Sequence, residues 1–165
     1  MNSKYYLAYG SNINMGIMKK HCPQAKLVGT AQLKDWALKT AGKDEEAWFT
    51  IERSQNHRVP AAIWTITEMD EKGLDSYEEW PELYRKEMIT VNMKKLQKPS
   101  SGCCCMALEK KRDQYESVEC LVYIMNEDMK PAKPSKKYIR DCMMGYEMLG
   151  FDREILKEAV TGEDI

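Results

Sequence analysis

Short apolar segments separated by polar turns predict a chain rich in β-strands. Residues 4–9 form an aromatic-rich apolar run that stops at Gly10, as expected of a buried strand delivering the chain into a turn. Residues 59–66 form a second buried strand. Pro60 should lie at the beginning of this strand or on a free edge, because proline cannot donate a ladder hydrogen bond.

Two later segments, 84–96 and 117–125, alternate between apolar and polar positions and predict two more strands. Residues 25–40 and 47–53 carry scattered apolar positions and indicate strands more weakly. Between the alternating segments lies Gln97–Glu116, which is long for a hairpin loop in a compact domain.

Helical spacing predicts short helices around Met15–Lys20 and over Thr67–Tyr77, and two more near the end of the chain. Ser135 is a good N-cap for the third helix and Gly150 ends it, while Asp152 can cap the last. Strands followed by terminal helices favour an α+β fold with a small barrel or curled sheet. With no internal repeat or long linker, we expect residues 1–165 to form a single domain.

Composition and charge narrow the class of protein. The chain is 43% hydrophobic and 31% charged, which is a globular composition, and no segment approaches the roughly 18 apolar residues of a membrane helix. The N-terminus lacks the features of a signal peptide, so we expect a cytoplasmic protein. A net charge of −1 argues against a nucleic-acid partner.

The six cysteines do not have the spacing of a zinc site. No C-x-x-C pair occurs, and the adjacent Cys103, Cys104 and Cys105 cannot all face one ion with good geometry. We expect reduced thiols and no metal. A site formed by Cys103, Cys105 and a distant ligand remains an open alternative.

Two segments carry candidate chemistry. Gly10, Ser11 and Asn12 form a turn that can expose several backbone N–H groups, and such a nest binds anionic or polarised oxygens. Asp75 and Glu78 are three residues apart and would share a helix face among aromatic residues. A carboxyl partly desolvated there would have a raised pKa, as a general acid/base requires. From pattern alone, an ordinary turn and a solvated acidic helix end remain the simpler interpretations.

His21 and His57 are the only histidines, and no G-x-S-x-G elbow is present. An arrangement of Ser11, a histidine and an aspartate for hydrolysis is conceivable. A structural or surface role for both histidines is the simpler interpretation.

Five segments, in order along the chain, resemble the gamma-glutamylcyclotransferase-like proteins, which include the AIG2-like group. They are Tyr6-Leu7-Ala8-Tyr9-Gly10-Ser11-Asn12, His21-Cys22-Pro23-Gln24-Ala25 with Gly29-Thr30-Ala31, Leu74-Asp75-Ser76-Tyr77-Glu78 with Pro81, Tyr84 and Arg85, Leu121-Val122-Tyr123-Ile124, and Pro134-Ser135-Lys136-Lys137-Tyr138 with Gly145 and Glu147. The resemblance spans about residues 4–160.

The resemblance implies a small mixed barrel flanked by helices and cyclisation of a gamma-glutamyl amine or peptide to 5-oxoproline, with release of the amine. It implies Glu78 as the catalytic acid/base and no metal or organic cofactor. It also implies a substrate loop formed by Tyr6, Leu7, Ala8, Tyr9, Gly10, Ser11 and Asn12, with Tyr123 as a pocket tyrosine. The implied partner is a small gamma-glutamyl molecule, while the leaving group and the oligomeric state stay open.

The chain departs from the family pattern at three places. Glu79 stands where the family usually has glycine, and Ala62 stands where glycine is common. The Cys-containing segment 97–116 is an insertion relative to the pattern. Two rival functions therefore stay in view, because a fold does not fix a function: a non-catalytic protein that binds a small carboxylated amine, and a Ser/His hydrolase.

Overall fold

The computed structural model describes residues 3–43, 46–96 and 113–160 of the chain. These ranges contain β-strands, α-helices and one short 3-10 helix. In chain order they are β1 (Lys4–Ala8), η1 (Ser11–Ile13), α1 (Met15–His21), β2 (Lys26–Lys43), β3 (Glu46–Ile66), α2 (Glu68–Tyr77), β4 (Tyr84–Lys95), β5 (Tyr115–Met125), β6 (Lys130–Pro131), α3 (Lys136–Leu149) and α4 (Glu154–Ala159).

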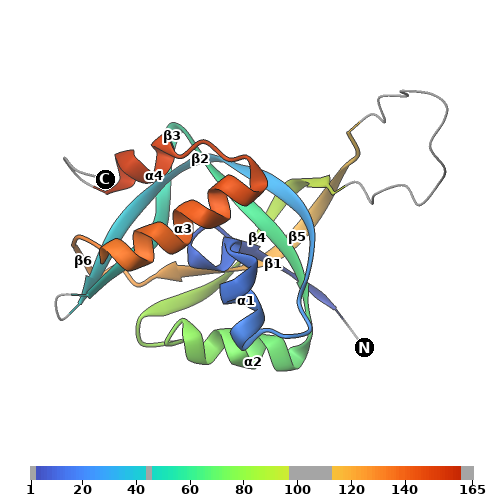
Figure 1. Cartoon of the computed structure of the whole chain (residues 1–165), viewed down its shortest axis with the longest axis horizontal. Coiled ribbons are helices and arrows are strands. Elements are labelled where there is room, and N and C mark those ends of the chain that lie inside the picture. The colour runs from blue at the N-terminus through green and yellow to red at the C-terminus, as the bar shows by residue number, and fades with distance from the viewer. Residues whose placement is uncertain (1–2, 44–45, 97–112, 161–165) are drawn as a thin grey trace.

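Five of the strands close into a mixed barrel (Figure 1). Their order is β3-β1-β5-β4-β2, and β2 pairs again with β3 to complete the ring. β1 runs parallel to β5, with Tyr6 opposite Leu121, whereas the other pairings are antiparallel. The short β6 adds to β2. This architecture confirms the predicted α+β class with a small mixed barrel flanked by helices.

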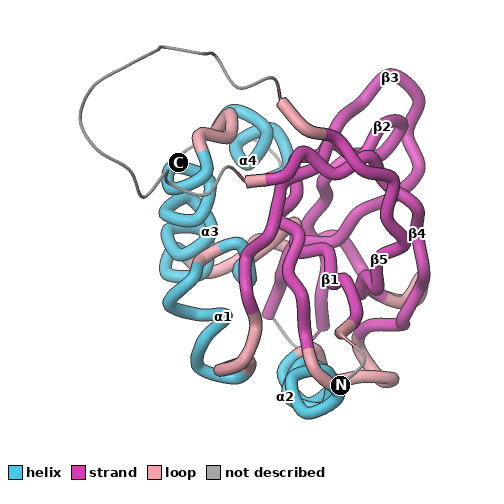
Figure 2. Tube along the Cα trace, turned by 90° about the vertical axis from the view of Figure 1, so that its right-hand side faces the viewer, coloured by secondary structure: helices cyan, strands magenta, loops and turns pink. Residues whose placement is uncertain are grey.

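The helices cover one side and one end of the barrel. Figure 2 shows α1, α3 and α4 together beside the strands, while α2 lies across one end. In β5, every side chain from Cys120 to Met125 is buried, so both faces of this part of the strand are covered. Strict alternation therefore describes only the first part of β5.

The β2–β3 hairpin is much longer than the sequence pattern predicts. Both weakly predicted segments belong to strands of 18 and 21 residues, and β3 continues without a break through the predicted strand 59–66. Pro60 therefore does not begin its strand. It pairs with Gln32 on one side, while β1 ends at Ala8 opposite Ala62, so the proline lies at a locally free edge.

α3 begins and ends at the predicted signals, whereas the N-cap of α4 is Arg153, one residue after the predicted Asp152. The Ser135 hydroxyl accepts a hydrogen bond from the Tyr138 amide, and Gly150 ends α3 in the left-handed conformation with φ 67°. Asp152 accepts a hydrogen bond from the Glu154 amide at the start of α4.

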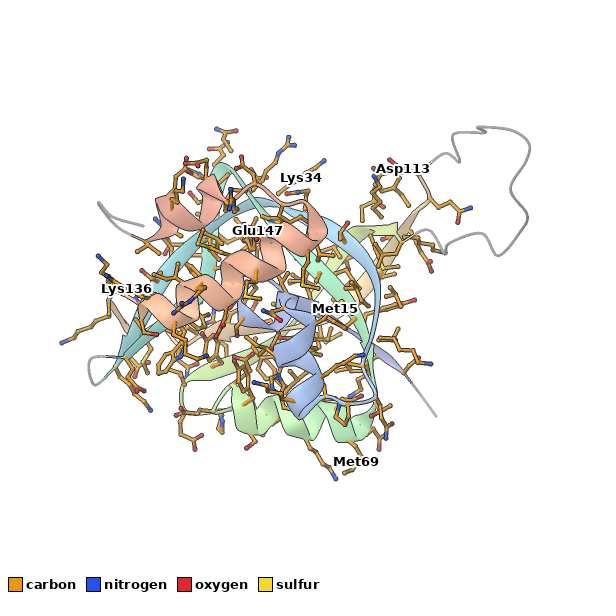
Figure 3. All side chains as sticks on the ribbon, in the orientation of Figure 1. Met15, Lys34, Met69, Asp113, Lys136 and Glu147 are labelled. Atoms are coloured by element: carbon orange, nitrogen blue, oxygen red, sulfur yellow. The ribbon has the colours of Figure 1, made fainter. Side chains whose placement is uncertain are left out.

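α2 turns a single apolar side chain fully inward. Thr67 and Asp70 cap its first turn reciprocally, and Leu74 is completely buried. Met69 lies on the outer face, labelled in Figure 3, where it is 67% exposed. The end of α2 places Tyr77 and Glu78 against the loop that follows β1, where they bond to Ser11 and Asn12.

The Cys-containing segment predicted at 97–116 is only partly described. β5 already begins at Tyr115, so the connection between β4 and β5 is shorter than predicted. Residues 97–112 lie outside the described residues, and the hypothesis of a metal site at Cys103 and Cys105 is therefore untested.

Two glycines permit close helix contacts, one between α3 and the loop that follows β1, the other between α2 and the end of α1. A Cβ on Gly145 of α3 would lie 2.8 Å from the Asn14 nitrogen and 2.9 Å from the Ile13 side chain. A Cβ on Gly73 of α2 would lie 2.2 Å from the carbonyl oxygen of His21. Each of these two contacts is close because the glycine has no side chain.

Replacing Gly145 by Ala should lower the free energy of unfolding by about 1–3 kcal/mol, because the new methyl group must push α3 away from the loop backbone. This should hold although alanine is the better helix former. Denaturant unfolding measures the change, and the neighbouring Met144→Ala, at a half-exposed position, is the control, with an expected change within about 0.5 kcal/mol. Equal stabilities of the two variants would contradict the close packing.

Candidate active site

A small pocket lies where β1, the loop after it, α2 and α3 meet. Its volume is about 20 Å³, which is room for roughly one water molecule. Among its lining residues, Gly10, Glu78 and Tyr138 keep some exposure to solvent, so they form the mouth. The full lining is Tyr6, Leu7, Tyr9, Gly10, Ser11, Asn12, Phe49, Glu78, Tyr84, Tyr123 and Tyr138.

The floor of the pocket is the turn that ends β1. Within the described part of the chain, the amides of Ser11 and Asn12 have no intramolecular hydrogen-bond acceptor, so they can donate to a ligand. Gly10 allows the close approach of α3 here, since a Cβ would lie 3.2 Å from the Tyr138 hydroxyl. That hydroxyl accepts a hydrogen bond of 3.1 Å from the Phe49 amide, which ties α3 to β3 across the pocket.

Glu78 is placed by the end of α2. It is the C-cap, and its amide donates to the Leu74 carbonyl oxygen over 2.8 Å. The next residue, Glu79, has φ 50°, in the left-handed region that favours glycine. The helix therefore ends at Glu78, whose side chain lines the pocket. The same φ gives a physical reason for glycine at the position of Glu79 in the family pattern.

The Glu78 carboxyl is held by neutral hydrogen-bond donors. Asn12 Nδ2 donates to Glu78 Oε1 and to the Tyr6 hydroxyl, each over 2.9 Å. Burial raises the pKa of Glu78 to about 8, and a hydrogen bond from Tyr6 opposes this rise. Burial and the nearby Glu78 charge raise the pKa of Tyr6 well above its ordinary value, so Tyr6 keeps its proton and remains a donor. A carboxyl that titrates in this range can both take and return a proton near neutral pH.

Tyr123 lines the pocket, and its hydroxyl is bonded to a residue that lies outside the pocket lining. Its hydroxyl donates to Asp75 Oδ1 over 2.6 Å, and burial, then Asp75, raises its pKa. Lys86 pairs with Asp75 at 2.7 Å and with Glu71 at 2.8 Å. Lys86 also lies 4.6 Å above the Trp80 ring. Asp75 is thus held in an ion-pair network, in which Lys4 also pairs with Glu71 at 2.7 Å.

The structure brings together almost all of the predicted site residues. Tyr6, Leu7, Tyr9, Gly10, Ser11, Asn12, Glu78 and Tyr123 line the pocket. Ala8 does not, because it is buried within β1 opposite Ala62. Phe49, Tyr84 and Tyr138 were not assigned to the site from the sequence. Tyr84 and Tyr138 fall in segments that resemble the family, whereas nothing in the sequence around Phe49 signals the pocket.

The geometry does not form a Ser/His hydrolase site. The Ser11 hydroxyl pairs with the Tyr77 hydroxyl at 2.9 Å, while His21 Nε2 lies 2.9 Å from Asn12 Oδ1. His57 is exposed on the β2–β3 hairpin and bonds to Ser54. Since neither histidine is hydrogen-bonded to Ser11, the hydrolase alternative loses its required base.

In the described ranges, no cluster of three or more His, Cys, Asp or Glu side chains is arranged to hold a metal ion. Cys22, Cys120 and Cys142 are buried free thiols. None of the described helices has the length and apolar character needed to cross a membrane.

Glu78 should make the protein less stable as pH rises. The folded state keeps this proton up to about pH 8, whereas the unfolded chain releases it near its ordinary pKa of 4.5. The folded state therefore binds more protons in this window, and stability falls through it. Glu78→Gln removes the effect, so at about pH 9 the variant should unfold with a free energy higher by on the order of a few kcal/mol, and near pH 4 the gap should close.

Denaturant unfolding of wild type, Glu78→Gln and Glu79→Gln across this pH range measures the difference. Glu79 is exposed and lies 3.7 Å from Lys43, so its variant is the matched control. A stability difference between wild type and Glu78→Gln that does not change with pH would refute the raised pKa.

Comparison with known proteins identifies sequence and structural relatives of this chain. The model described as gamma-glutamyl cyclotransferase, AIG2-like, matches residues 6–141. A solved gamma-glutamyl cyclotransferase superposes with a TM-score of 0.73 at 20% identity, covering 99% of this chain and 90% of its own. An uncharacterized protein from Homo sapiens gives 0.72 at 21% identity, with coverages of 100% and 90%.

A yeast gamma-glutamyl cyclotransferase described as specific to glutathione gives a TM-score of 0.57 at 12% identity, with coverages of 97% and 96%. At these identities, the structural likeness establishes the fold. No match was found among curated proteins. Because the family model covers most of the sequence, from β1 into α3, this chain belongs to the gamma-glutamyl cyclotransferase, AIG2-like, family.

Proposed function

We propose that this chain cyclises a gamma-glutamyl amine or peptide to 5-oxoproline and releases the amine, with Glu78 as general acid/base. The observation that carries the proposal is the Glu78 carboxyl itself. It lies in a pocket with a pKa raised to about 8, its hydrogen-bond donors are neutral, and it faces loop amides that have no partner within the described chain.

The reaction needs one proton to move twice. Glu78 accepts a proton from the substrate's α-amine as its nitrogen attacks the γ-carbonyl carbon, and a new C–N bond closes the five-membered ring. The carbonyl becomes an oxyanion that the amides of Ser11 and Asn12 can stabilise. Glu78 then returns the proton to the leaving nitrogen while the original C–N bond breaks. The products are 5-oxoproline and a free amine, and no proton is gained or lost overall.

Ring closure within one molecule suits a narrow aromatic pocket. The pocket wall is largely tyrosine and phenylalanine, which can hold the glutamyl chain bent, and correct orientation supplies a large part of the acceleration in such reactions. A volume of about 20 Å³ is smaller than a glutamyl group, so binding requires the mouth at Gly10, Glu78 and Tyr138 to widen.

Glu78→Gln should reduce 5-oxoproline release by roughly a factor of 10²–10⁴, because the amide cannot carry the proton. The assay uses a panel of gamma-glutamyl dipeptides, gamma-glutamyl amines and glutathione. Glutathione is included because the yeast structural relative is described as specific to it. Glu79→Gln changes the adjacent carboxylate, which points to Lys43, and should retain activity.

Substantial turnover by Glu78→Gln would remove Glu78 from the mechanism. Release by wild type and by Glu79→Gln, with loss in Glu78→Gln, would establish the reaction and identify the leaving group. If wild type releases 5-oxoproline from no member of the panel, the enzyme proposal fails for these substrates. The non-catalytic binding function then becomes the better account.

A further inference from the structure

His21 lies just outside the pocket, where α1 ends against α2. Its ring stacks on Tyr77 with a centroid distance of 4.0 Å and an interplanar angle of 16°. Gly73 permits this approach, since a Cβ there would collide with the His21 backbone. His21 is not among the residues that line the pocket, so it does not reach a substrate directly.

The Asn12 amide links His21 to Glu78. Asn12 is 3% exposed, and an amide offers two N–H donors and one carbonyl acceptor. Both donors are used, on the Tyr6 hydroxyl and on Glu78 Oε1, so Oδ1 is left to accept. The group opposite Oδ1 is His21 Nε2, at 2.9 Å. The three bonds are mutually consistent only if His21 carries a proton on Nε2.

The opposite tautomer would favour the opposite amide. With the proton on Nδ1 alone, Nε2 becomes an acceptor and attracts the Asn12 NH₂ group. A rotated amide would then turn its oxygen toward the Glu78 carboxylate, and Glu78 would lose a donor and gain a repulsive neighbour. Tyr6 would lose the bond that fixes its hydroxyl for donation to Glu78.

We propose that His21, in its Nε2–H form, is a positioning residue that fixes the Asn12 amide in the orientation that donates to Glu78 and Tyr6. His21 acts through Asn12 and not on the substrate. Its consequence for turnover rests on the proposed function, whereas its consequence for the Glu78 carboxyl does not.

The surroundings of His21 favour the neutral imidazole. Burial, and then the charge of Lys20, lower the pKa of His21 below its ordinary value. Tyr77, which covers the ring, is itself held by Ser11. The ring is therefore fixed in place and uncharged near neutral pH, and its tautomer decides the direction of the Asn12 bond.

Two substitutions distinguish the effect of the His21 N–H donor from the effect of its aromatic ring. His21→Phe keeps an aromatic ring against Tyr77 but has no donor for Asn12. His21→Gln loses the ring but places an amide N–H near the position of Nε2. His57→Phe, on the exposed hairpin, is the matched control. If His21→Phe does not fold, His21→Asn replaces it, because its shorter amide cannot reach Asn12.

The first measurement follows the Glu78 side-chain carboxyl by ¹³C NMR as pH is varied, without any substrate. In His21→Phe the midpoint should rise by about one pH unit, because the ionised carboxyl loses a donor. In His21→Gln and His57→Phe it should stay within a few tenths of a unit of wild type. An unchanged midpoint in His21→Phe overturns the proposal, and so does an equal rise in His21→Gln.

Two further measurements test the same role of His21, one on its tautomer and one on turnover. Long-range ¹H–¹⁵N correlation of the imidazole should show the Nε2–H tautomer in wild type, and the Nδ1–H tautomer would overturn the proposal. With an active substrate, kcat/KM near neutral pH should fall about tenfold in His21→Phe and recover in His21→Gln, in line with the carboxyl midpoint. If wild type turns over no substrate, the proposed function fails, while both NMR readouts still decide the role of His21.

Discussion

The desolvation of one carboxyl is the constraint on which this site depends. Taking Glu78 out of water disfavours its ionised form and raises its pKa to about 8. The fold compensates with neutral donors from Asn12 and Tyr6. Because neither donor carries a charge, the carboxyl is kept in place without being locked in its ionised form.

The neighbouring carboxylates show how environment divides roles within one short segment. Asp75 binds Lys86 and the Tyr123 hydroxyl, and Glu79 lies near Lys43. Glu78 stands between them in sequence, yet it has no cationic partner within the described residues. Asp75 and Glu79 are thus held in ion pairs, while Glu78 is left to titrate near neutral pH. Such different environments for neighbouring carboxyl groups are what assigns one of them to acid/base chemistry.

The barrel and its helices hold these groups at fixed spacing. β1 lies between β3 and β5, so the turn that follows it starts from a rigid strand. Gly145 lets α3 press on one side of the turn, and Gly73 lets α2 press on the end of α1. Both contacts involve backbone atoms, which cannot move aside as a flexible side chain can. The pocket geometry is therefore coupled to the packing of three helices.

The sequence by itself determined the local features of this protein. Caps such as Ser135 and Gly150 depend on neighbouring residues and were predicted correctly, as were the first strand, which ends at Ala8 just before the Gly10 turn, and the class of fold. Tertiary structure decided the rest. The β2–β3 hairpin is long because its strands pair with each other from one end of β2 to the other, with two register shifts, and the apolar pattern of either strand alone cannot reveal that pairing. Similarly, Phe49 lines the pocket, and His21 reaches Asn12, only because barrel closure and helix packing bring distant segments together. Such contacts depend on the whole chain, so no local pattern records them.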